Sequence, residues 1–277
     1  MKQAIGTVCL VYLFGCALAQ SQSESDSKRG FASGRVVNGT TVSIEDYPFL
    51  VRLRYAGRFF CGASVITSKH ALTAAHCLFF EPDAADLELF GGSSDASNGT
   101  TFSVSSYSIH PQFKYENANN DAAIVTIVGT FADHRNIAAI PLQTTELRYS
   151  SNNPTWCFVA GWGYTNGKVV SPSQTLQLGW TPLVSQYSCQ QMWGRRVTIT
   201  PQMICAKLQN MTSCRGDSGG PLVCNGQLTG IVSLGDLYCT GRLPSIFTRV
   251  DSNSVREFIS IVTASTGNIF KENHIGS

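Results

Sequence analysis

Short apolar runs, rich in β-branched and aromatic residues and separated by turn residues, recur along most of the chain. They occupy residues 49–55, 64–66, 71–73, 124–128, 157–160, 222–224, 228–232 and 246–250. Runs of this length and composition are typical of β-strands. The pattern therefore predicts an all-β chain.

Two segments depart from this pattern. Residues 252–264 follow a candidate helix cap at Asp251 or Ser252. Their apolar positions recur at helical spacing and are Val255, Phe258, Ile259 and Val262. Residues 141–154 are polar and nearly free of apolar runs. We therefore expect a C-terminal helix and, near 141–154, a connection between two β units of comparable size.

Residues 1–19 have the composition of a secretory signal peptide. Lys2 precedes an apolar run, and the small residues Ala17 and Ala19 provide a cleavage site. A membrane anchor is the alternative, but no later stretch approaches the length of about 20 apolar residues that spans a bilayer. We expect a secreted, extracellular protein with no membrane association.

Composition and charge narrow the function classes. Of the 277 residues, 43% are hydrophobic and 14% are charged, which is enough to bury a sizeable core. The formal net charge of +2 gives no basis for a nucleic acid or an anionic membrane as partner. No Cys-x-x-Cys or His-Glu-x-x-His motif occurs, so we expect neither a metal nor another cofactor.

Ten cysteines, less Cys9 and Cys16 in the signal segment, leave eight. These are Cys61, Cys77, Cys157, Cys189, Cys205, Cys214, Cys224 and Cys239. An even number in an exported chain favours four disulfides over metal binding. Sequons that begin at Asn38, Asn98 and Asn210 are compatible with glycosylation of an exported protein.

The run TSCRGDSGGP at residues 212–221 permits three interpretations. The first is the adhesion tripeptide Arg-Gly-Asp at 215–217, which must lie on an exposed and mobile loop to be bound. Here Cys214 and Cys224 flank the tripeptide and an apolar strand follows it closely. A tripeptide match also arises often by chance, so the adhesion interpretation is disfavoured.

The second interpretation is the Gly-x-Ser-x-Gly nucleophile elbow of an α/β hydrolase around Ser218. His274 could complete such a site with Asp236 or Asp251, in the chain order of those enzymes. That fold alternates strands with helices, whereas short strands and turns precede Ser218, and His274 lies in a polar tail. The elbow is therefore disfavoured as well.

The third interpretation places a base and an acid upstream of Ser218. His76 lies among small residues in Leu-Thr-Ala-Ala-His-Cys, where a disulfide at Cys77 would fix the backbone beside it. On its own, this residue could equally be a core histidine. Asp121 stands at the entrance of an apolar strand, where a buried charge needs a partner such as an imidazole N–H.

This order of His, Asp and Ser resembles the chymotrypsin-like (trypsin-fold) serine protease family. Six motifs in register carry the resemblance and span nearly all of the chain after residue 34. They are Arg-Val-Val-Asn-Gly at 35–39, Leu-Thr-Ala-Ala-His-Cys at 72–77, Asn-Asp-Ala-Ala at 120–123, Gly-Trp-Gly at 161–163, Cys-Arg-Gly-Asp-Ser-Gly-Gly-Pro at 214–221 and Gly-Ile-Val-Ser-Leu-Gly at 230–235. The resemblance implies two six-stranded antiparallel β-barrels packed side by side, with a C-terminal helix and the catalytic residues at the barrel junction.

The resemblance also implies a role for each site residue. Ser218 would be the nucleophile, His76 the general base and acid, and Asp121 the residue that orients the imidazole. The backbone N–H groups of Gly216 and Ser218 would form the oxyanion hole, and Ser233 would support Asp121. The implied activity is the hydrolysis of peptide bonds in protein or peptide substrates.

Synthesis as a zymogen is a further implication. Residues 20–35 would be an activation propeptide, and a trypsin-like protease cutting after Arg35 would free the α-amino group of Val36. That group would pair with Asp217 and order the oxyanion loop. The protease domain would comprise residues 36–277, act as a monomer and be a target for protein inhibitors.

The family pattern implies a disulfide pairing. It also indicates how this chain differs from the calcium-binding members of the family. The implied pairs are Cys61–Cys77, Cys157–Cys224, Cys189–Cys205 and Cys214–Cys239. No cysteine remains to tether the propeptide. Calcium-binding members carry acidic residues where this chain has Gly-Gly-Ser-Ser at 91–94, so we expect no calcium there.

The primary substrate pocket is where the sequence departs most from trypsins. In this family the residue six before the nucleophile lies at the pocket base and is Asp in trypsins, whereas here it is Thr212. A neutral base favours cleavage after apolar or aromatic residues. Gly235 leaves the entrance open, and Ser245, where glycine is usual, narrows or polarises the interior. Leu234 replaces a tryptophan, and a basic preference through Asp236 is an alternative.

A catalytically inactive homologue that acts as a binding or adaptor protein is the competing class. Such proteins usually lack the nucleophile, the histidine or the oxyanion glycine. Here Ser218, His76, Asp121 and Gly216 are all present. The sequence therefore favours an active hydrolase.

Overall fold

The structure is a computed structural model that describes residues 39–147, 149–150, 152–164, 171–207, 212–236 and 238–268, with side chains up to residue 265. The expected signal segment and propeptide, with Val36, lie outside the described residues. The sequons at Asn38 and Asn210 lie outside them as well, whereas Asn98 is described and exposed.

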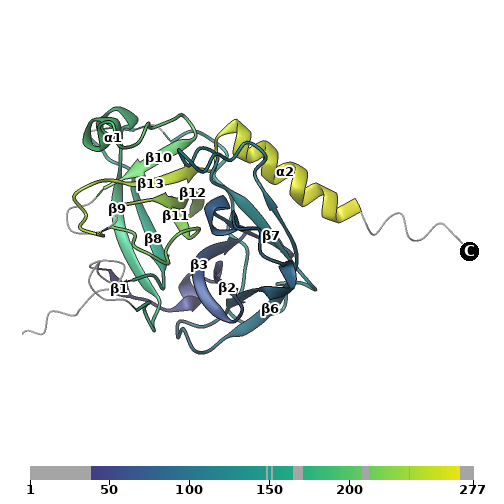
Figure 1. Cartoon of the computed structure of the whole chain (residues 1–277). Helices are drawn as coiled ribbons and strands as arrows, with labels where there is room; N and C mark the ends of the chain where they lie inside the picture. The colour runs from purple at the N-terminus through teal and green to yellow at the C-terminus, as the bar shows by residue number, and fades with distance from the viewer. Residues whose placement is uncertain are drawn as a thin grey trace, which may run out of the picture. The chain divides into compact units, whose positions relative to one another are not determined.

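The first barrel is a closed antiparallel sheet of six strands. They are β2 (Leu50–Tyr55), β3 (Arg58–Val65), β4 (His70–Thr73), β5 (Leu87–Gly91), β6 (Thr100–Ile109) and β7 (Ala123–Ile127). Around the barrel they follow the order β2-β3-β4-β7-β6-β5, and most of them appear in purple to teal in Figure 1. Short 3-10 helices lie at Ile44–Asp46, Ala75–Cys77 and Ala84–Asp86.

The second barrel also has six strands and closes through the pairing of β8 with β9. They are β8 (Trp156–Gly161), β9 (Gln177–Val184), β10 (Met203–Ala206), β11 (Pro221–Cys224), β12 (Gln227–Leu234) and β13 (Ser245–Arg249). The two-residue strand β1 (Thr40–Thr41) adds to the edge of β9. Helix α1 (Gln186–Trp193) follows β9, and helix α2 (Asn253–Asn268) follows β13 (Figure 1).

The predicted all-β class, the two antiparallel barrels and the C-terminal helix are confirmed. Strand β7 is buried at all five positions, as its unbroken apolar run requires. The sequence analysis missed β6, where only Phe102 and Val104 of the first six residues are buried and serines and threonines alternate with them. It also missed β9, whose sequence contains Gly179 and Pro182.

The barrels share one hydrophobic cluster rather than keeping two separate cores. That cluster contains Leu53 and Ile124 of the first barrel together with Val223 and Ile231 of the second. Helix α2 contributes Phe258, which contacts the ring of the buried His110 at a centroid distance of 4.9 Å. The second barrel has two smaller clusters of its own. The shared cluster fixes the barrel junction, where the site lies.

Four disulfides connect Cys61–Cys77, Cys157–Cys224, Cys189–Cys205 and Cys214–Cys239. These are the pairs that the family resemblance implies. Only the first lies in the first barrel, and the other three belong to the second. None of the helices in the described part of the chain has the length and apolar character needed to cross a membrane.

Candidate active site

Strand pairing in the first barrel brings His76 and Asp121 together. Strand β4 ends at Thr73, and the chain turns at once into the 3-10 helix that carries His76. Strand β7 begins two residues after Asp121. Because β4 and β7 are antiparallel, with Thr73 opposite Ala123, the end of one strand lies beside the start of the other.

The Asp121 carboxylate is fully buried and has three hydrogen-bond donors. The Nδ1 atom of His76 lies 2.7 Å from Oδ2, and the backbone N–H of His76 donates to Oδ1 over 2.8 Å. Ser233 Oγ of the second barrel donates to Oδ2 over 2.5 Å. Thr248 Oγ1, also from the second barrel, donates to the backbone carbonyl of Asp121 over 2.8 Å. These donors offset the free-energy cost of burying a charge.

Two effects on the pKa of His76 oppose each other. Burial lowers the pKa, whereas the hydrogen bond to Asp121 and its negative charge raise it. The effect of Asp121 prevails, and the pKa lies above its ordinary value of 6.5. The side chain is still 26% exposed. An imidazole in this position can accept a proton and keep it stabilised as a cation.

Ser218 lies in the turn that leads into β11 and lines a cavity of about 220 Å³. Ser233, which donates to Asp121, lines the same cavity. The backbone carbonyl of Ser218 accepts a hydrogen bond from Gly62 N–H of β3 over 2.8 Å. The serine is therefore held against the first barrel by its backbone and opens to the cavity.

Among the described residues, no side-chain hydrogen bond joins His76 to Ser218, and the two are linked through Ser233, which lines the cavity of Ser218 and donates to Asp121. The Nε2 atom of His76 instead lies 3.8 Å from Sγ of Cys77. Catalytic hydrogen bonds are often long or absent in ligand-free enzymes and tighten when a substrate binds. The structure thus joins His76, Asp121 and Ser233 in one network and leaves Ser218 beside it.

Two backbone N–H groups next to Ser218 are free to bind an anion. Neither Gly216 nor Ser218 has an acceptor for its amide within the described residues. Gly216 has φ +86°, and a Cβ there would lie 3.1 Å from the ring of Phe59 and 3.2 Å from the Cα of Gly163. A side chain is therefore excluded at Gly216 by conformation and by space.

Asp217 turns away from the cavity into the protein interior and is 3% exposed. Its carboxylate accepts hydrogen bonds from Cys214 N–H over 2.9 Å and Gly163 N–H over 3.0 Å. Burial raises the pKa of Asp217 to about 6, although both hydrogen bonds act to lower it. No cation pairs with this carboxylate among the described residues. A positively charged partner would therefore stabilise this buried carboxylate.

The predicted pocket residues divide into two groups. Gly235 lines the cavity beside Ser218, whereas Thr212 and Ser245 do not. Their hydroxyl oxygens lie 3.1 Å apart, and Ser213 Oγ donates to Ser245 Oγ over 3.0 Å. Ser213 lines the cavity, so the three hydroxyl groups form one uncharged, hydrogen-bonded cluster next to it.

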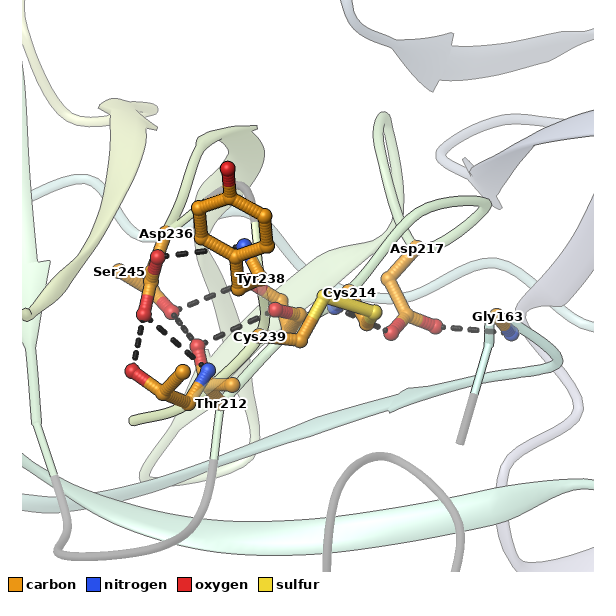
Figure 2. The surroundings of a disulfide bond; sticks show 10 residues. Gly163, Thr212, Cys214, Asp217, Asp236, Tyr238, Cys239 and Ser245 are labelled. Carbon is orange, nitrogen blue, oxygen red and sulfur yellow. Dashed lines mark hydrogen bonds between the residues drawn. A yellow bond between two sulfur atoms is a disulfide. The ribbon is translucent and has the colours of Figure 1, made fainter. Parts of the chain in front are cut away.

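The disulfide Cys214–Cys239 joins the two segments that form the cavity walls. Figure 2 shows it between the Thr212 and Ser245 hydroxyls on one side and the Asp217 carboxylate on the other. The second segment also carries Asp236, which lines the cavity. Asp236 accepts hydrogen bonds from Tyr238 N–H over 3.2 Å and Thr240 N–H over 3.1 Å, and a third from the Thr240 hydroxyl.

One group of possible metal ligands occurs within the described residues, and it lies next to the site. It consists of Cys61, His76 and Cys77. The two sulfur atoms form a disulfide with each other, so neither is a thiolate. His76 is left as a single ligand, which does not hold a metal.

The comparisons with known proteins agree with this geometry. A model of the family described as Trypsin matches residues 36–259. The chain belongs to the trypsin family. Trypsin delta of Drosophila melanogaster is 35% identical over 246 residues, covering 88% of this chain and 94% of the relative. Trypsin 5G1 of Aedes aegypti is 32% identical over 260 residues, with coverages of 90% and 95%. Trypsin beta of Drosophila erecta is 33% identical over 246 residues, with coverages of 88% and 94%.

Membership of the trypsin family makes this chain a serine protease by descent and fold. The sequence analysis missed two residues that the structure places at the trypsin-family site. Ser213 lines the cavity and donates to Ser245, and Thr248 donates to the backbone carbonyl of Asp121. Neither residue stands out in sequence, although Ser213 is adjacent to a predicted pocket residue and is as deeply buried.

Proposed function

We propose that this trypsin-family protein is a secreted endopeptidase that cleaves peptide bonds with Ser218, His76 and Asp121. The hydrogen-bonded network of His76, Asp121 and Ser233, adjacent to the cavity that Ser218 lines, is the observation that carries the proposal. Four disulfides and the N-terminal signal segment support an exported protein.

In the proposed reaction, Ser218 Oγ attacks the carbonyl carbon of the scissile bond while His76 takes the hydroxyl proton. The amides of Gly216 and Ser218 stabilise the oxyanion of the tetrahedral intermediate, and each such donor contributes about 3–4 kcal/mol in related sites. His76 then gives the proton to the leaving amine, and an acyl-enzyme remains. Water, deprotonated by His76, hydrolyses that ester and restores the Ser218 hydroxyl.

Activation by cleavage after Arg35 is part of the proposal. The buried Asp217, with its raised pKa and without a cation among the described residues, supports it. An α-amino group freed at Val36 would pair with that carboxylate and offset the cost of its burial. The pairing would fix the adjacent Gly216 and Ser218 amides in the geometry that binds an oxyanion.

For the primary pocket, we propose a preference for apolar side chains of medium size or aromatic side chains. The cavity of about 220 Å³ is smaller than the sites of about 300–1,000 Å³ that hold drug-sized ligands, and its size suits one side chain. We take the hydroxyl cluster of Thr212, Ser213 and Ser245 as the base of the pocket, and this cluster carries no charge that would attract a substrate cation.

A second candidate is a preference for Lys or Arg, because Asp236 lines the same cavity as Ser218. The trypsin names of the relatives point in the same direction. Three hydrogen bonds from its own loop already engage the Asp236 carboxylate, which reduces its availability to a substrate. Substrate profiling of the protein and of Asp236→Asn separates the two candidates.

The decisive experiment combines activation with labelling. The full chain is cleaved after Arg35 with trypsin, the trypsin is removed, and the product is treated with a fluorophosphonate probe. We expect labelling of the cleaved protein at Ser218, and none in Ser218→Ala or in uncleaved Arg35→Gln. A cleaved, folded protein that takes up no probe would identify an inactive homologue with a binding role. Labelling of the uncut chain at full rate would refute the zymogen.

A further inference from the structure

Two hollows adjoin the cavity of Ser218. One, of about 430 Å³, shares Gly235 and Asp236 with that cavity. The other, of about 300 Å³, shares Leu234 with it. Arg196 lines both hollows. The segment Leu234–Asp236 is therefore a common wall of three depressions, and only the first contains the proposed nucleophile.

Arginines surround both hollows. Arg196 and Arg242 line the larger one, and Arg195 and Arg196 line the smaller one. All three are exposed, and none forms an ion pair with an acid among the described residues. We call Arg195, Arg196 and Arg242 the arginine rim.

Two acids also lie along these hollows and do not cancel the arginine rim. Asp236 directs its carboxylate to its own loop, where it accepts a hydrogen bond from the N–H group of Tyr238 (Figure 2). The N–H group and the hydroxyl of Thr240 donate to it as well. Burial opposes ionisation, but these hydrogen bonds and the charge of Arg242 hold the pKa of Asp236 below its ordinary value. Glu116 is exposed beside two arginines. Because Arg196 is common to both hollows, three arginines face two acids, and the excess is one positive charge over the two hollows together.

The loop that carries Arg195 and Arg196 is held in place from helix α1. Gln190 Nε2 donates to Gly194 O over 2.7 Å and to Val197 O over 3.0 Å. Its Oε1 accepts a hydrogen bond from Ile199 N–H over 2.8 Å. Three hydrogen bonds from one side chain order the loop before any ligand arrives, which lowers the entropy lost on binding.

The floor of the larger hollow is apolar. Trp193 is buried and donates its indole N–H to Pro244 O over 3.1 Å, and Leu243 lies beside it. An apolar floor with a cationic edge suits a side chain that has a methylene stem and an anionic end. Glutamate and aspartate are the peptide side chains of this kind.

The direction of a bound substrate indicates which part of it reaches these hollows. If its side chain fills the cavity, its carbonyl carbon faces Ser218, and the residues on either side of the cut extend beyond the cavity. We place the residues before the cut along Leu234–Asp236, because that segment borders both the cavity and the two hollows. They then pass the arginine rim.

We propose that the arginine rim recognises acidic side chains in the peptide segment that precedes the cleaved bond. This inference rests on the proposed endopeptidase function, because it uses the direction in which a substrate crosses Ser218. It adds a requirement that the primary pocket does not impose: a good substrate carries Asp or Glu two to four residues before the bond that is cut.

Fluorogenic peptides with one fixed residue before the cut, and Glu, Gln or Lys at each of the three preceding positions, test this directly. We expect kcat/KM for Glu to exceed that for Gln by about 3- to 10-fold at one position or more, with Lys lowest. Raising the salt from about 0.05 to 0.5 M should reduce the difference, because the arginines are exposed. Equal rates for Glu and Gln at all three positions at low salt would overturn the inference.

Substitutions of the rim arginines test whether the arginine rim is the source of the preference for Glu over Gln. Arg196→Gln should remove most of the Glu-over-Gln difference and leave the rate on the Gln peptide unchanged, and Arg196→Lys should retain it. The control is Arg135→Gln, an exposed arginine of the first barrel whose ion pair with Glu45 lies outside the two hollows. If the preference survives Arg195→Gln/Arg196→Gln/Arg242→Gln, it arises elsewhere and the inference is wrong.

A binding assay keeps this test separate from the test of catalysis. Ser218→Ala protein, cleaved after Arg35, is titrated with the same Glu and Gln peptides carrying a fluorophore, and anisotropy gives Kd. Tighter binding of the Glu peptide by about 3- to 10-fold supports the arginine rim even if the wild-type protein hydrolyses nothing. Equal Kd values contradict it even if fluorophosphonate labelling supports the proposed protease.

Discussion

The two barrels supply different parts of the site and hold them in different ways. In the first barrel, the pairing of β4 with β7 alone brings His76 to Asp121. In the second, Ser218 and most of the cavity walls lie on turns and loops, and the end of strand β12 (Val232–Leu234) supplies the rest. Three of the four disulfides belong to that barrel, and Cys214–Cys239 joins the cavity walls directly.

This difference separates proton transfer from substrate choice. A pair held by strand register within a buried core has little freedom to vary, whereas loops fixed by a few covalent links can change their side chains without disturbing the barrel. We therefore expect substitutions at His76 and Asp121 to affect all substrates alike. Substitutions at cavity residues of the second barrel other than Ser218 and Ser233 should instead change the order of preferred substrates.

The largest effect is expected from Asp121→Asn. Loss of the negative charge leaves His76 in the wrong tautomer and unable to hold a proton, and an equivalent change lowers kcat by about 10⁴-fold in a related triad. The fall should be the same for every substrate, measured as kcat on a peptide panel. Asp133→Asn is the control, because this aspartate is exposed in the same barrel. If Asp121→Asn changed the order of preferred substrates, proton transfer and substrate choice would not be separate.

The second-largest effect is expected when one disulfide is removed from either barrel, and its consequences should differ between the two barrels. In the chain-entropy model, loss of Cys214–Cys239 or of Cys61–Cys77, which close 25 and 16 residues, lowers the free energy of unfolding by about 3–4 kcal/mol in either case. Double alanine variants and chemical denaturation measure this. Only the loss of Cys214–Cys239 should also raise KM and change the substrate order, because only that disulfide joins cavity walls. Equal kinetic effects of both losses would contradict this view.

The pocket base offers the third test. Thr212→Asp introduces a carboxylate beside Ser213 and Ser245, and a buried charge pair with a substrate is worth about 2–5 kcal/mol. The ratio of kcat/KM for Lys over Leu before the cut should rise at least about 30-fold. Thr212→Asn, which has a similar size and no charge, should leave the ratio unchanged. An unchanged ratio in folded Thr212→Asp would show that Ser213 screens this position from the substrate.

The sequence predicted the fold where each strand was one continuous apolar run. Strand β7 is such a case, because both of its faces are buried. Strand β6 was missed because one face is exposed and its serines and threonines hide the alternation. Strand β10 was also missed, although all four of its residues are buried.

For the site, the sequence was a good guide to which residues take part. It was a poorer guide to which of their side chains face the cavity. The family motifs led to His76 and Asp121, whose side chains the structure places 2.7 Å apart. Thr212 is predicted at the base of the substrate pocket, and in the structure the adjacent Ser213 lines the cavity of Ser218. Both residues are buried and polar, so neither composition nor periodicity distinguishes them. Side-chain direction in a loop follows from backbone dihedrals that only the folded chain defines.

The smallest expected effect is at Ser233, the residue of the second barrel that bonds to the first barrel's carboxylate. Ser233→Ala removes a charge-assisted hydrogen bond of 2.5 Å to Asp121 Oδ2, the oxygen that also faces His76. We expect kcat to fall about 10-fold with little change in substrate order. Ser105→Ala, which removes a bond to the Thr126 carbonyl in the first barrel, is the control.

The pH profile of Ser233→Ala tests the physical reason for that fall. Catalysis needs neutral His76, so kcat/KM decreases as the pH drops through the pKa of His76, which lies above 6.5 in the native protein. Without the Ser233 donor, Oδ2 of Asp121 is a stronger base and holds the imidazolium more firmly. The acid limb of the pH profile should therefore move to higher pH. If it stays in place or moves to lower pH, the role of Ser233 is to position the substrate and not to position Asp121.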